Sequence, residues 1–563
     1  MRRPVIALIT APALALAGAL TVAAPASAAV GTEAELVTAL TTAVDGDTIE
    51  LAGDITLTAD LPVIDADVEI IGGGSTLDGA GSYETLRIAP NHTVTIRDLT
   101  VADAGGAGVA VDDTVPGDGE VALTLDGVTI TGSAGAGVDA RLSGTLTVTD
   151  VRIETNTGSG LDVELQGGEL EIADAVISRN GGHGVYATGD GGDVTITGSQ
   201  IDANGDPSLE WDGVLLLEVN DFRLSMSDTT TSDNNRHGTR IRGSDIAVDL
   251  TRVTADHNGY PDFGFGFVLE ATGGIATLDA VDSELSTNIE SGMFLNVGLT
   301  SEAALRIDRV TVADNARGGI SAYIGDGTRF DLVNSTIVGN GYAPSATYTV
   351  AVHVENTGGG AVANLSHTTV VGNHINTGWP AVGILGAERP DLVPLQAALS
   401  HMIISDNGES PNDLGEIDAG LMYEVTIDHS YIGRRIETVD PPIAAAIAAG
   451  VGNISGLDPQ LGALADNGGY GRTMLPLPGS PVLDAGVATL TAPTTDQRGL
   501  ARVAGPAADL GAVEVQPAPP TQPEGDGEPQ LADTGADAAL PAALALLAML
   551  GGITLLGRRR RRA

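Results

Sequence analysis

An arginine and two carboxylates near the middle of the chain are the first candidates for chemistry. Arg240 could supply the base of a polysaccharide lyase, and Asp233 and Glu270 could hold the Ca²⁺ ion that such a reaction uses. Aspartate and glutamate together number 74, so closeness in the sequence selects no site by itself. No other cofactor is expected, and Ca²⁺ belongs only to this lyase interpretation.

Aromatic and basic residues also stand at regular positions in this part of the chain. Each is the second or fourth residue after a glycine that opens an alternating apolar stretch: Tyr186, Arg240, Arg242, Phe294 and Tyr323. Because strand residues alternate between two faces, we expect these side chains to face solvent. Rings stack on sugars and guanidinium groups hold carboxylates in a fork, so we predict a glycan-binding face, with an ordinary mixed surface as the alternative.

Motifs for other metal or nucleotide chemistry are absent from the sequence. It contains no EF-hand loop, zinc-binding spacing, phosphate-cradling loop or nucleophile elbow. His237 and His257 stand beside Asp233 and Asp256 in predicted turns, and we interpret both histidines as solvated by water. We therefore predict no metal site.

An internal repeat must position these residues. Asparagines recur at intervals of 24 to 34 residues in matching contexts: Asn156, Asn180, Asn204, Asn234, Asn258, Asn288, Asn315, Asn340, Asn373 and Asn407. A unit of this length cannot bury its own apolar face, so it must stack on copies of itself as the coils of a parallel β-helix do. A short amide tolerates unusual backbone angles and bonds the equivalent amide of the next coil. We therefore interpret the asparagines as a structural ladder.

The chain before the repeat predicts a cap. Thr32-Glu33-Ala34-Glu35 has the pattern of a capping box, which predicts a helix to about Val44 that covers the open end of the stack. With the strand over 46–51 and the Ile70-Ile71-Gly72-Gly73-Gly74 turn, it resembles the start of the pectate-lyase-like right-handed β-helix superfamily. The resemblance implies an all-β fold, a right-handed single-stranded parallel β-helix of about thirteen coils.

Two short motifs resemble those of the polygalacturonase family of β-helix hydrolases, Gly182-His183-Gly184 and Arg240-Ile241-Arg242. That family also needs an Asn-Thr-Asp and a paired aspartate, which protonate the leaving oxygen and activate water. This chain has Asn156-Thr157-Gly158 instead, and no aspartate pair lies between it and His183. A glycoside hydrolase is therefore less expected than a lyase, and a protein without catalytic activity is expected over both.

Residues 465–514 form a linked series of glycine- and proline-rich motifs, such as Asp496-Gln497-Arg498-Gly499. The series resembles the C-terminal closing module of many anchored bacterial β-helix proteins. Its charged residues have the types of a catalytic set, but we interpret them as pairing to fix the loops: Asp484, Arg498, Asp509 and Glu514.

Composition restricts the partners. The formal net charge is −47, all 27 basic residues are arginine, and cysteine is absent. A field this negative repels polyanions, so nucleic acid is excluded as a partner, and disulfides and thiol chemistry are excluded as well.

The first 28 residues predict export. They begin with Met1-Arg2-Arg3, continue with an apolar stretch and end in Ala26-Ser27-Ala28. This order is typical of a secretory signal peptide, in which Ala26 and Ala28 are the small residues that signal peptidase accepts. A retained membrane anchor is the alternative.

The C-terminal residues predict attachment to the cell surface. Leu531-Ala532-Asp533-Thr534-Gly535 precedes an apolar run over 538–556 and five arginines. As a helix, at ~1.5 Å per residue, the run would span the ~30 Å membrane core, with its arginines on the cytoplasmic side. This order resembles the LPXTG-like sorting signal of Gram-positive surface proteins, in which sortase joins the threonine, here Thr534, to peptidoglycan. Ala532 resembles the variant common in high-GC actinobacteria. A C-terminal membrane anchor is the alternative.

The predicted organisation has five parts: a signal peptide (1–28), a β-helix with its cap (29–464), the closing module (465–514), a Pro-rich extended stalk (515–530) and the sorting signal (531–563). The leading functional hypothesis is a wall-anchored, non-catalytic binding or structural module that contacts glycans. A polysaccharide lyase on the same fold is the competing hypothesis.

Overall fold

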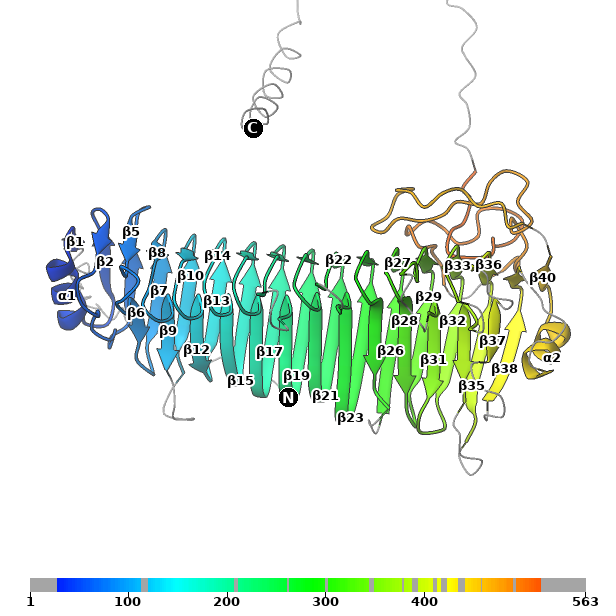
Figure 1. Ribbon diagram of the computed structural model, residues 1–563, viewed down its shortest axis with the longest axis horizontal. Helices are drawn as coiled ribbons and strands as arrows, with labels where there is room; N and C mark the ends of the chain where they lie inside the picture. Colours follow the sequence, from blue (N-terminus) through cyan, green and yellow to red (C-terminus); the bar gives the residue numbers. More distant parts are fainter. Residues whose placement is uncertain are drawn as a thin grey trace, which may run out of the picture. The chain divides into compact units, whose positions relative to one another are not determined.

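Alternating apolar residues wind the chain into coils that stack through parallel strands (Figure 1). The computed structural model describes residues 28–517, except for these internal stretches: 113–119, 207–210, 261–262, 299–301, 344–348, 377–378, 387–392, 409–412, 417–422, 434–440, 457 and 490–492. The strands form one sheet of 24 and one of 16, in which every pairing between named strands is parallel. The β-solenoid has about 13 turns, as predicted.

The central coils share one plan. A long strand of the larger sheet follows a three-residue strand of the smaller one, as in β14 (Arg152–Glu154) followed by β15 (Leu161–Ala173). The long strands of the next coils are β17 (Val185–Thr197), β19 (Val214–Ser227), β21 (Thr239–Thr251) and β23 (Phe267–Val281). Their buried side chains alternate with exposed ones, because the inward positions of every coil fill one continuous core of Val, Ile, Leu and Ala.

The asparagine ladder is confirmed. The side-chain Nδ2 of each asparagine from Asn156 to Asn373 donates to Oδ1 of the next asparagine, at 2.8 to 3.2 Å. The last one, Asn407, donates to Asp413 Oδ1 at 3.2 Å. All ten asparagines are buried, so the amides satisfy one another where water cannot.

Replacing Asn258 by alanine is expected to lower the free energy of unfolding by about 1 to 3 kcal/mol, because it leaves buried bonding partners on two coils unsatisfied. Thermal and denaturant unfolding measure the loss. Asn220→Ala is the matched control, since it removes an exposed amide that also bonds its neighbours. Equal stability of the two variants would contradict the ladder's contribution.

Both ends of the described solenoid carry a helix. Helix α1 (Glu33–Thr42) begins at the predicted cap Thr32 and buries Leu36 and Leu40 against the first coils. Helix α2 (Pro441–Ala449) lies beside the last long strand, β38 (Tyr423–Asp428), and was not predicted. Its Ile443 and Ile447 join the core, so α2 covers that end of the stack.

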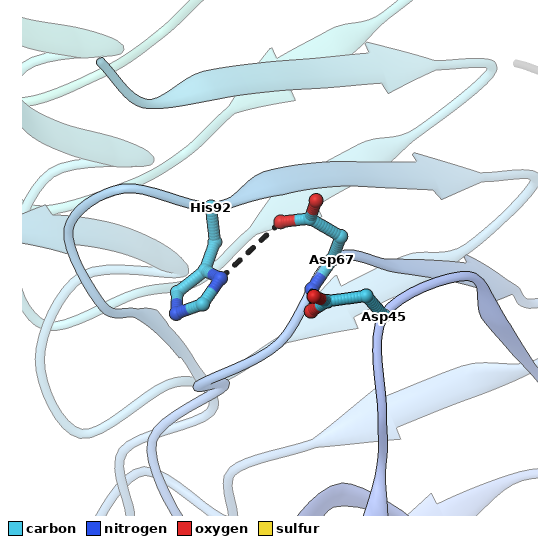
Figure 2. Close-up of side chains that lie close together, drawn as sticks. All are labelled: Asp45, Asp67 and His92. Atoms are coloured by element: carbon cyan, nitrogen blue, oxygen red, sulfur yellow. Dashed lines mark hydrogen bonds and ion pairs between the residues drawn. The ribbon is translucent and has the colours of Figure 1, made fainter. Parts of the chain in front are cut away.

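The first coils also bring polar turns together. Asp45, Asp67 and His92 lie just before β2 (Asp47–Leu51), β4 (Val68–Ile71) and β7 (Thr93–Arg97). These three strands pair in sequence, so their starts share one edge of the larger sheet (Figure 2).

Several predicted segments lie outside the described residues: Ala26 and most of the signal peptide, most of the stalk, the pentapeptide 531–535, the apolar run 538–556 and the arginine tail. Within the described part of the chain, neither helix is long and apolar enough to cross a membrane.

Candidate functional site

The predicted outward positions line up from coil to coil. Tyr186 pairs with Leu215, Leu215 with Arg240, and Arg240 with Val268. Val268 pairs in turn with Phe294 of β25 (Ser291–Asn296). The register derived from the glycines is therefore correct, and the face it defines crosses at least five coils.

Exposure along this face differs from the prediction. Leu215 and Val268 are only 5% and 3% exposed, although both point away from the core. Each lies in a strand that follows a longer connection, 205–213 or 259–266, and these connections carry Trp211, Phe263 and Phe265. The predicted open face is therefore closed to solvent at these two positions.

The proposed catalytic set is not assembled. Nε and Nη2 of Arg240 both donate to Oε2 of Glu270, at 2.8 and 2.5 Å. The guanidinium is therefore engaged by a carboxylate and is only 16% exposed. Asp233 sits in the turn before the ladder, where its N–H donates to Asp256 O, and among the described residues it contacts neither Arg240 nor Glu270. The structure therefore pairs two members of the candidate lyase set, Arg240 and Glu270, and places Asp233 in a separate turn.

Arg242 differs from Arg240. It lies two residues further along β21, is exposed, and makes no ion pair with any described residue. Of the two arginines predicted to contact an acidic glycan, only this one presents a free guanidinium.

A buried row of polar side chains holds the inserted connections in place. His183 Nδ1 accepts from the N–H of Asp212 at 2.9 Å, Asp212 Oδ1 accepts from the N–H of His237 at 3.0 Å, and His237 Nδ1 accepts from the N–H of Phe265 at 3.0 Å. A backbone N–H can only donate, so both imidazoles are neutral with their proton on Nε2. The prediction of a solvated His237 is wrong, whereas His257 is indeed exposed.

Burial disfavours the protonated, charged form of both imidazoles. Burial lowers the pKa of His183 to about 4, with Arg236 and Arg240 adding to the shift and the bond from Asp212 opposing it. The pKa of His237 lies well below its usual value for the same reasons, burial first. Neither ring is poised to exchange protons at neutral pH. The motif around His183 thus has a structural role in this chain.

Aromatic rings continue across the next coils. Phe263, Phe265, Phe294, Tyr323 and His353 follow one another with ring centroids 5.4 to 5.5 Å apart. The guanidinium of Arg236 lies 5.3 Å from the centre of the Phe263 ring, within the range of a cation–π contact. Phe263 is 43% exposed, so the row begins at the surface and passes into half-buried rings. We call these five residues the aromatic row.

Glu290 is a polar group at this row that sequence reasoning missed. It is buried two residues after the ladder residue Asn288, and its Oε1 lies 2.7 Å from Nη1 of Arg317. Burial raises its pKa to about 7, against the opposing charge of Arg317. A carboxyl group of this pKa could donate a proton at neutral pH. The sequence offered no signal for it, because carboxylates are frequent throughout.

A second surface lies on the other half of the long strands. A hollow of about 930 Å³ follows the bends of β15 to β23, and its charged and apolar lining includes Glu169, Asp193, Asp221, Arg223, Asp245 and Ile275. Arg223 lies between Asp193 and Asp249, at 3.9 and 4.0 Å. In the described part of the chain, no three of these carboxylates come close enough to share a metal ion.

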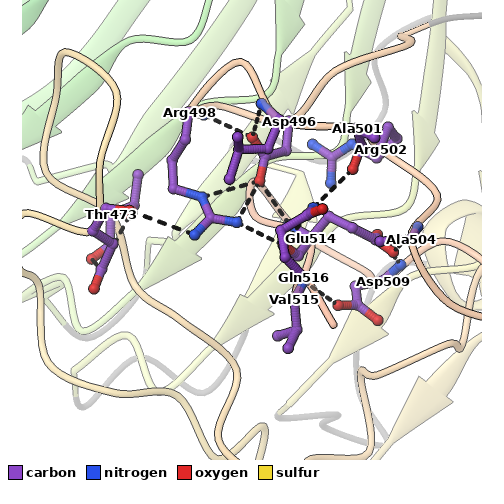
Figure 3. Close-up of polar contacts among 12 residues, drawn as sticks. Thr473, Asp496, Arg498, Ala501, Arg502, Ala504, Asp509, Glu514, Val515 and Gln516 are labelled. Carbon is purple, nitrogen blue, oxygen red and sulfur yellow. Dashed lines mark hydrogen bonds and ion pairs between the residues drawn. The ribbon is translucent and has the colours of Figure 1, made fainter. Parts of the chain in front are cut away.

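The charged residues of the predicted closing module pair with one another. Arg498 donates through Nε and Nη2 to Asp496 Oδ2 at 3.0 and 2.8 Å (Figure 3). Asp509 accepts from the N–H of Asp484, and Glu514 accepts from that of Asp509. Their interpretation as loop-fixing groups agrees with these bonds.

The module lies along the side of the solenoid. Tyr470 donates to Arg252 O at 2.7 Å, Gln497 bonds Thr336 at 2.6 Å, and Thr369 accepts from the N–H of Ala512 at 3.0 Å. These partners belong to different coils of the smaller sheet, so the segment braces several coils laterally, while α2 covers the end (Figure 1).

Comparison with known proteins supports the fold. Residues 84–245 match the family model described as "Right handed beta helix region". No curated protein matches the sequence.

Three solved structures are similar in shape. The mannuronan C-5 epimerase AlgE6 A-module of Azotobacter vinelandii has 14% identity and a TM-score of 0.37, over 70% of this chain and 93% of its own. Pectate lyase Pel9A has 13% identity and a TM-score of 0.25, over 85% and 90%. The PL6 family alginate lyase AlyGC has 10% identity and a TM-score of 0.21, over 77% and 89%. These distant likenesses assign no activity, and the match to the family model covers residues 84–245 alone.

Proposed function

We propose that this chain is a non-catalytic surface module that binds a polysaccharide along the aromatic row. The row of aromatic rings supports this proposal, because it runs from the exposed Phe263 across neighbouring coils to Tyr323. Rings offer sugars an apolar face without requiring a fixed hydrogen-bond pattern. An extended polymer lying along the solenoid would contact several coils at once.

The charged residues of the protein restrict the chemistry of the glycan that it could bind. Arg242 of β21, in the same sheet, is exposed and makes no ion pair with a described residue. A glycan that carries carboxylates could pair with Arg242, whereas Arg240 is held by Glu270. We therefore propose a glycan with sparse acidic groups, because the rest of the protein repels a dense polyanion.

The absence of an assembled acid–base pair favours binding over catalysis. Arg240 is neutralised, and His183 and His237 accept bonds from the backbone. Glu290 is the one group at the row with a pKa near neutrality, among those described, and it faces an arginine instead of a second carboxylate. Polysaccharide lyase activity remains the competing function, and the binding test below detects it.

We also propose that the module is exported and displayed on the cell wall of a Gram-positive, actinobacterium-like cell. The order of the leader, the pentapeptide ending in Thr534-Gly535, the apolar run and the arginines supports this proposal. Sortase and peptidoglycan would then be its partners, and a C-terminal membrane anchor is the alternative.

Retention of the purified protein on a panel of neutral and acidic polysaccharides tests the function. We expect retention without new reducing or unsaturated ends. Phe263→Ala with Tyr323→Ala should weaken binding roughly tenfold, because stacking on each ring is worth about 0.5 to 1.5 kcal/mol beyond the area buried. Ile275→Ala is the control, since Ile275 is 51% exposed in the hollow on the other surface.

Three outcomes would contradict the proposal. Product release would indicate an enzyme. Loss of retention in Ile275→Ala alone would move the site to the hollow. Unchanged retention in the double variant would remove the aromatic row from binding.

A further inference from the structure

Metal-ligating side chains converge where the first three coils begin. One oxygen each from Asp45 and Asp67 and one ring nitrogen of His92 lie within 4.8 Å of one another (Figure 2). Parallel pairing of β2, β4 and β7 creates this proximity, since each side chain precedes its strand at the same edge. No other group of three such ligands is this close within the described residues.

A fourth side chain orients the imidazole. Nε2 of His92 lies 3.1 Å from Oδ1 of Asp65, and Nδ1 lies 3.2 Å from Oδ1 of Asp67. A neutral imidazole has one N–H, so donation from Nε2 to Asp65 leaves the Nδ1 lone pair facing a carboxylate oxygen. That contact is repulsive unless a proton or a metal ion sits at Nδ1. Histidine ligands of metals commonly donate their other N–H to a carboxylate in this way.

The backbone fixes both carboxylates. Asp67 Oδ1 accepts from the N–H of Thr93 at 2.9 Å, and Asp45 Oδ1 accepts from the N–H of Asp67 at 3.1 Å. Each carboxylate keeps a second oxygen for an ion.

We propose that Asp45, Asp67 and Nδ1 of His92 bind one Zn²⁺ ion, with Asp65 as the positioning residue for the imidazole. One nitrogen and two carboxylates leave a coordination position for water, which suits Zn²⁺, whereas Ca²⁺ takes six to eight oxygen ligands. Asp45 is exposed, so the ion reaches the site from solvent. The ion links three consecutive turns beside α1 and offsets the repulsion among their carboxylates.

Zinc titration of the full chain tests this site. Calorimetry should show one saturable Zn²⁺ equivalent, and the melting temperature should rise by a few degrees with excess Zn²⁺. Ca²⁺ at the same concentration should produce neither effect. His92→Asn and Asp45→Asn should each weaken Zn²⁺ binding at least tenfold, while the folded protein's circular dichroism stays unchanged.

His257→Asn is the control, because His257 is an exposed histidine that also contacts a carboxylate, Asp256 Oδ2 at 3.0 Å. It should retain Zn²⁺ binding. Co²⁺ should give the visible absorption of a low-coordinate site in wild type and in His257→Asn, but not in His92→Asn. Equal Zn²⁺ binding by the wild type and His92→Asn would overturn the proposal. So would an absence of binding with His92 titrating as an imidazolium in NMR, because a proton would then occupy Nδ1.

Discussion

Thr534→Ala is expected to abolish covalent linkage of the protein to the cell wall and to leave it in the membrane fraction. Sortase would join the Thr534 carboxyl to peptidoglycan, so the substitution removes the acyl-transfer site while the apolar run 538–556 stays long enough to span the ~30 Å membrane core. Fractionation of cells of a sortase-bearing actinobacterium that express each form, with and without wall-digesting enzymes, measures the outcome.

Thr521→Ala in the stalk is the control, since it removes the same side chain outside the pentapeptide. It should leave wall linkage unchanged. Recovery of wall-linked Thr534→Ala protein in wild-type amounts would disprove the sorting signal. Release of the wild type by detergent alone would favour the membrane anchor.

The coil register could be predicted because parallel stacking enforces it. The ladder places one asparagine in each coil, and the glycine near the start of each strand marks the outward positions of Tyr186, Arg240 and Phe294. The prediction was wrong about the solvent exposure of the outward side chains, because exposure depends on the connections between the ladder and the strands. The spacing did hold a signal: the intervals from Asn204 to Asn234 and from Asn258 to Asn288 are 30 residues instead of 24. Most of the extra residues lie in the aromatic insertions, and the others lengthen β19 and β23.

Other features could not be predicted, because they depend on contacts that a repeat pattern does not encode. Arg240 and Glu270 occupy neighbouring coils, and their pairing turns a candidate base into a neutralised ion pair. The cluster at His92 lies before the first ladder residue, Asn156, where no repeated asparagine marks the register. Helix α2 had recognisable ends, a proline at its start and Gly450 after its last residue, but its uniformly apolar sequence lacks an amphipathic pattern.

Acidification is expected to destabilise the contact between the closing module (465–514) and the last coils of the solenoid. His367 and His401 stack with ring centroids 4.3 Å apart, and the ring of His429 lies 5.3 Å from that of His401. Nε2 of His401 accepts from the N–H of Val487 at 3.4 Å, so protonation of this nitrogen breaks a bond to the module. The buried guanidinium of Arg502, also in the module, adds positive charge nearby.

The direction of the pH effect follows from the pKa values. Burial lowers the pKa of His401 to about 4 and that of His367 to about 2, with neighbouring cations adding to both shifts and Asp428 opposing that of His401. Unfolded histidine has a pKa of about 6.5, so below that pH the unfolded chain binds protons that the folded chain does not. Stability is therefore full above about pH 6.5 and falls as the pH drops toward 4. Each histidine contributes at most about 1.4 kcal/mol per pH unit.

The double variant His367→Asn and His401→Asn isolates this effect from the other titrating groups. Both histidines have positive φ, of 49° and 55°, and Asn334 already occupies the equivalent turn one coil before His367 with a φ of 49°. Asparagine should thus be tolerated, and the variant should lose less stability than the wild type between pH 7 and pH 4.5. Thermal unfolding at both pH values measures the difference, and hydrogen exchange should show residues 465–516 opening first in the acidified wild type.

Glu290 has the opposite effect on the pH dependence of stability, and it has this effect in both proteins. Its raised pKa of about 7 means that the folded protein gains stability as the pH falls. Identical pH dependence in the wild type and the double variant would show that the stacked histidines do not control the module.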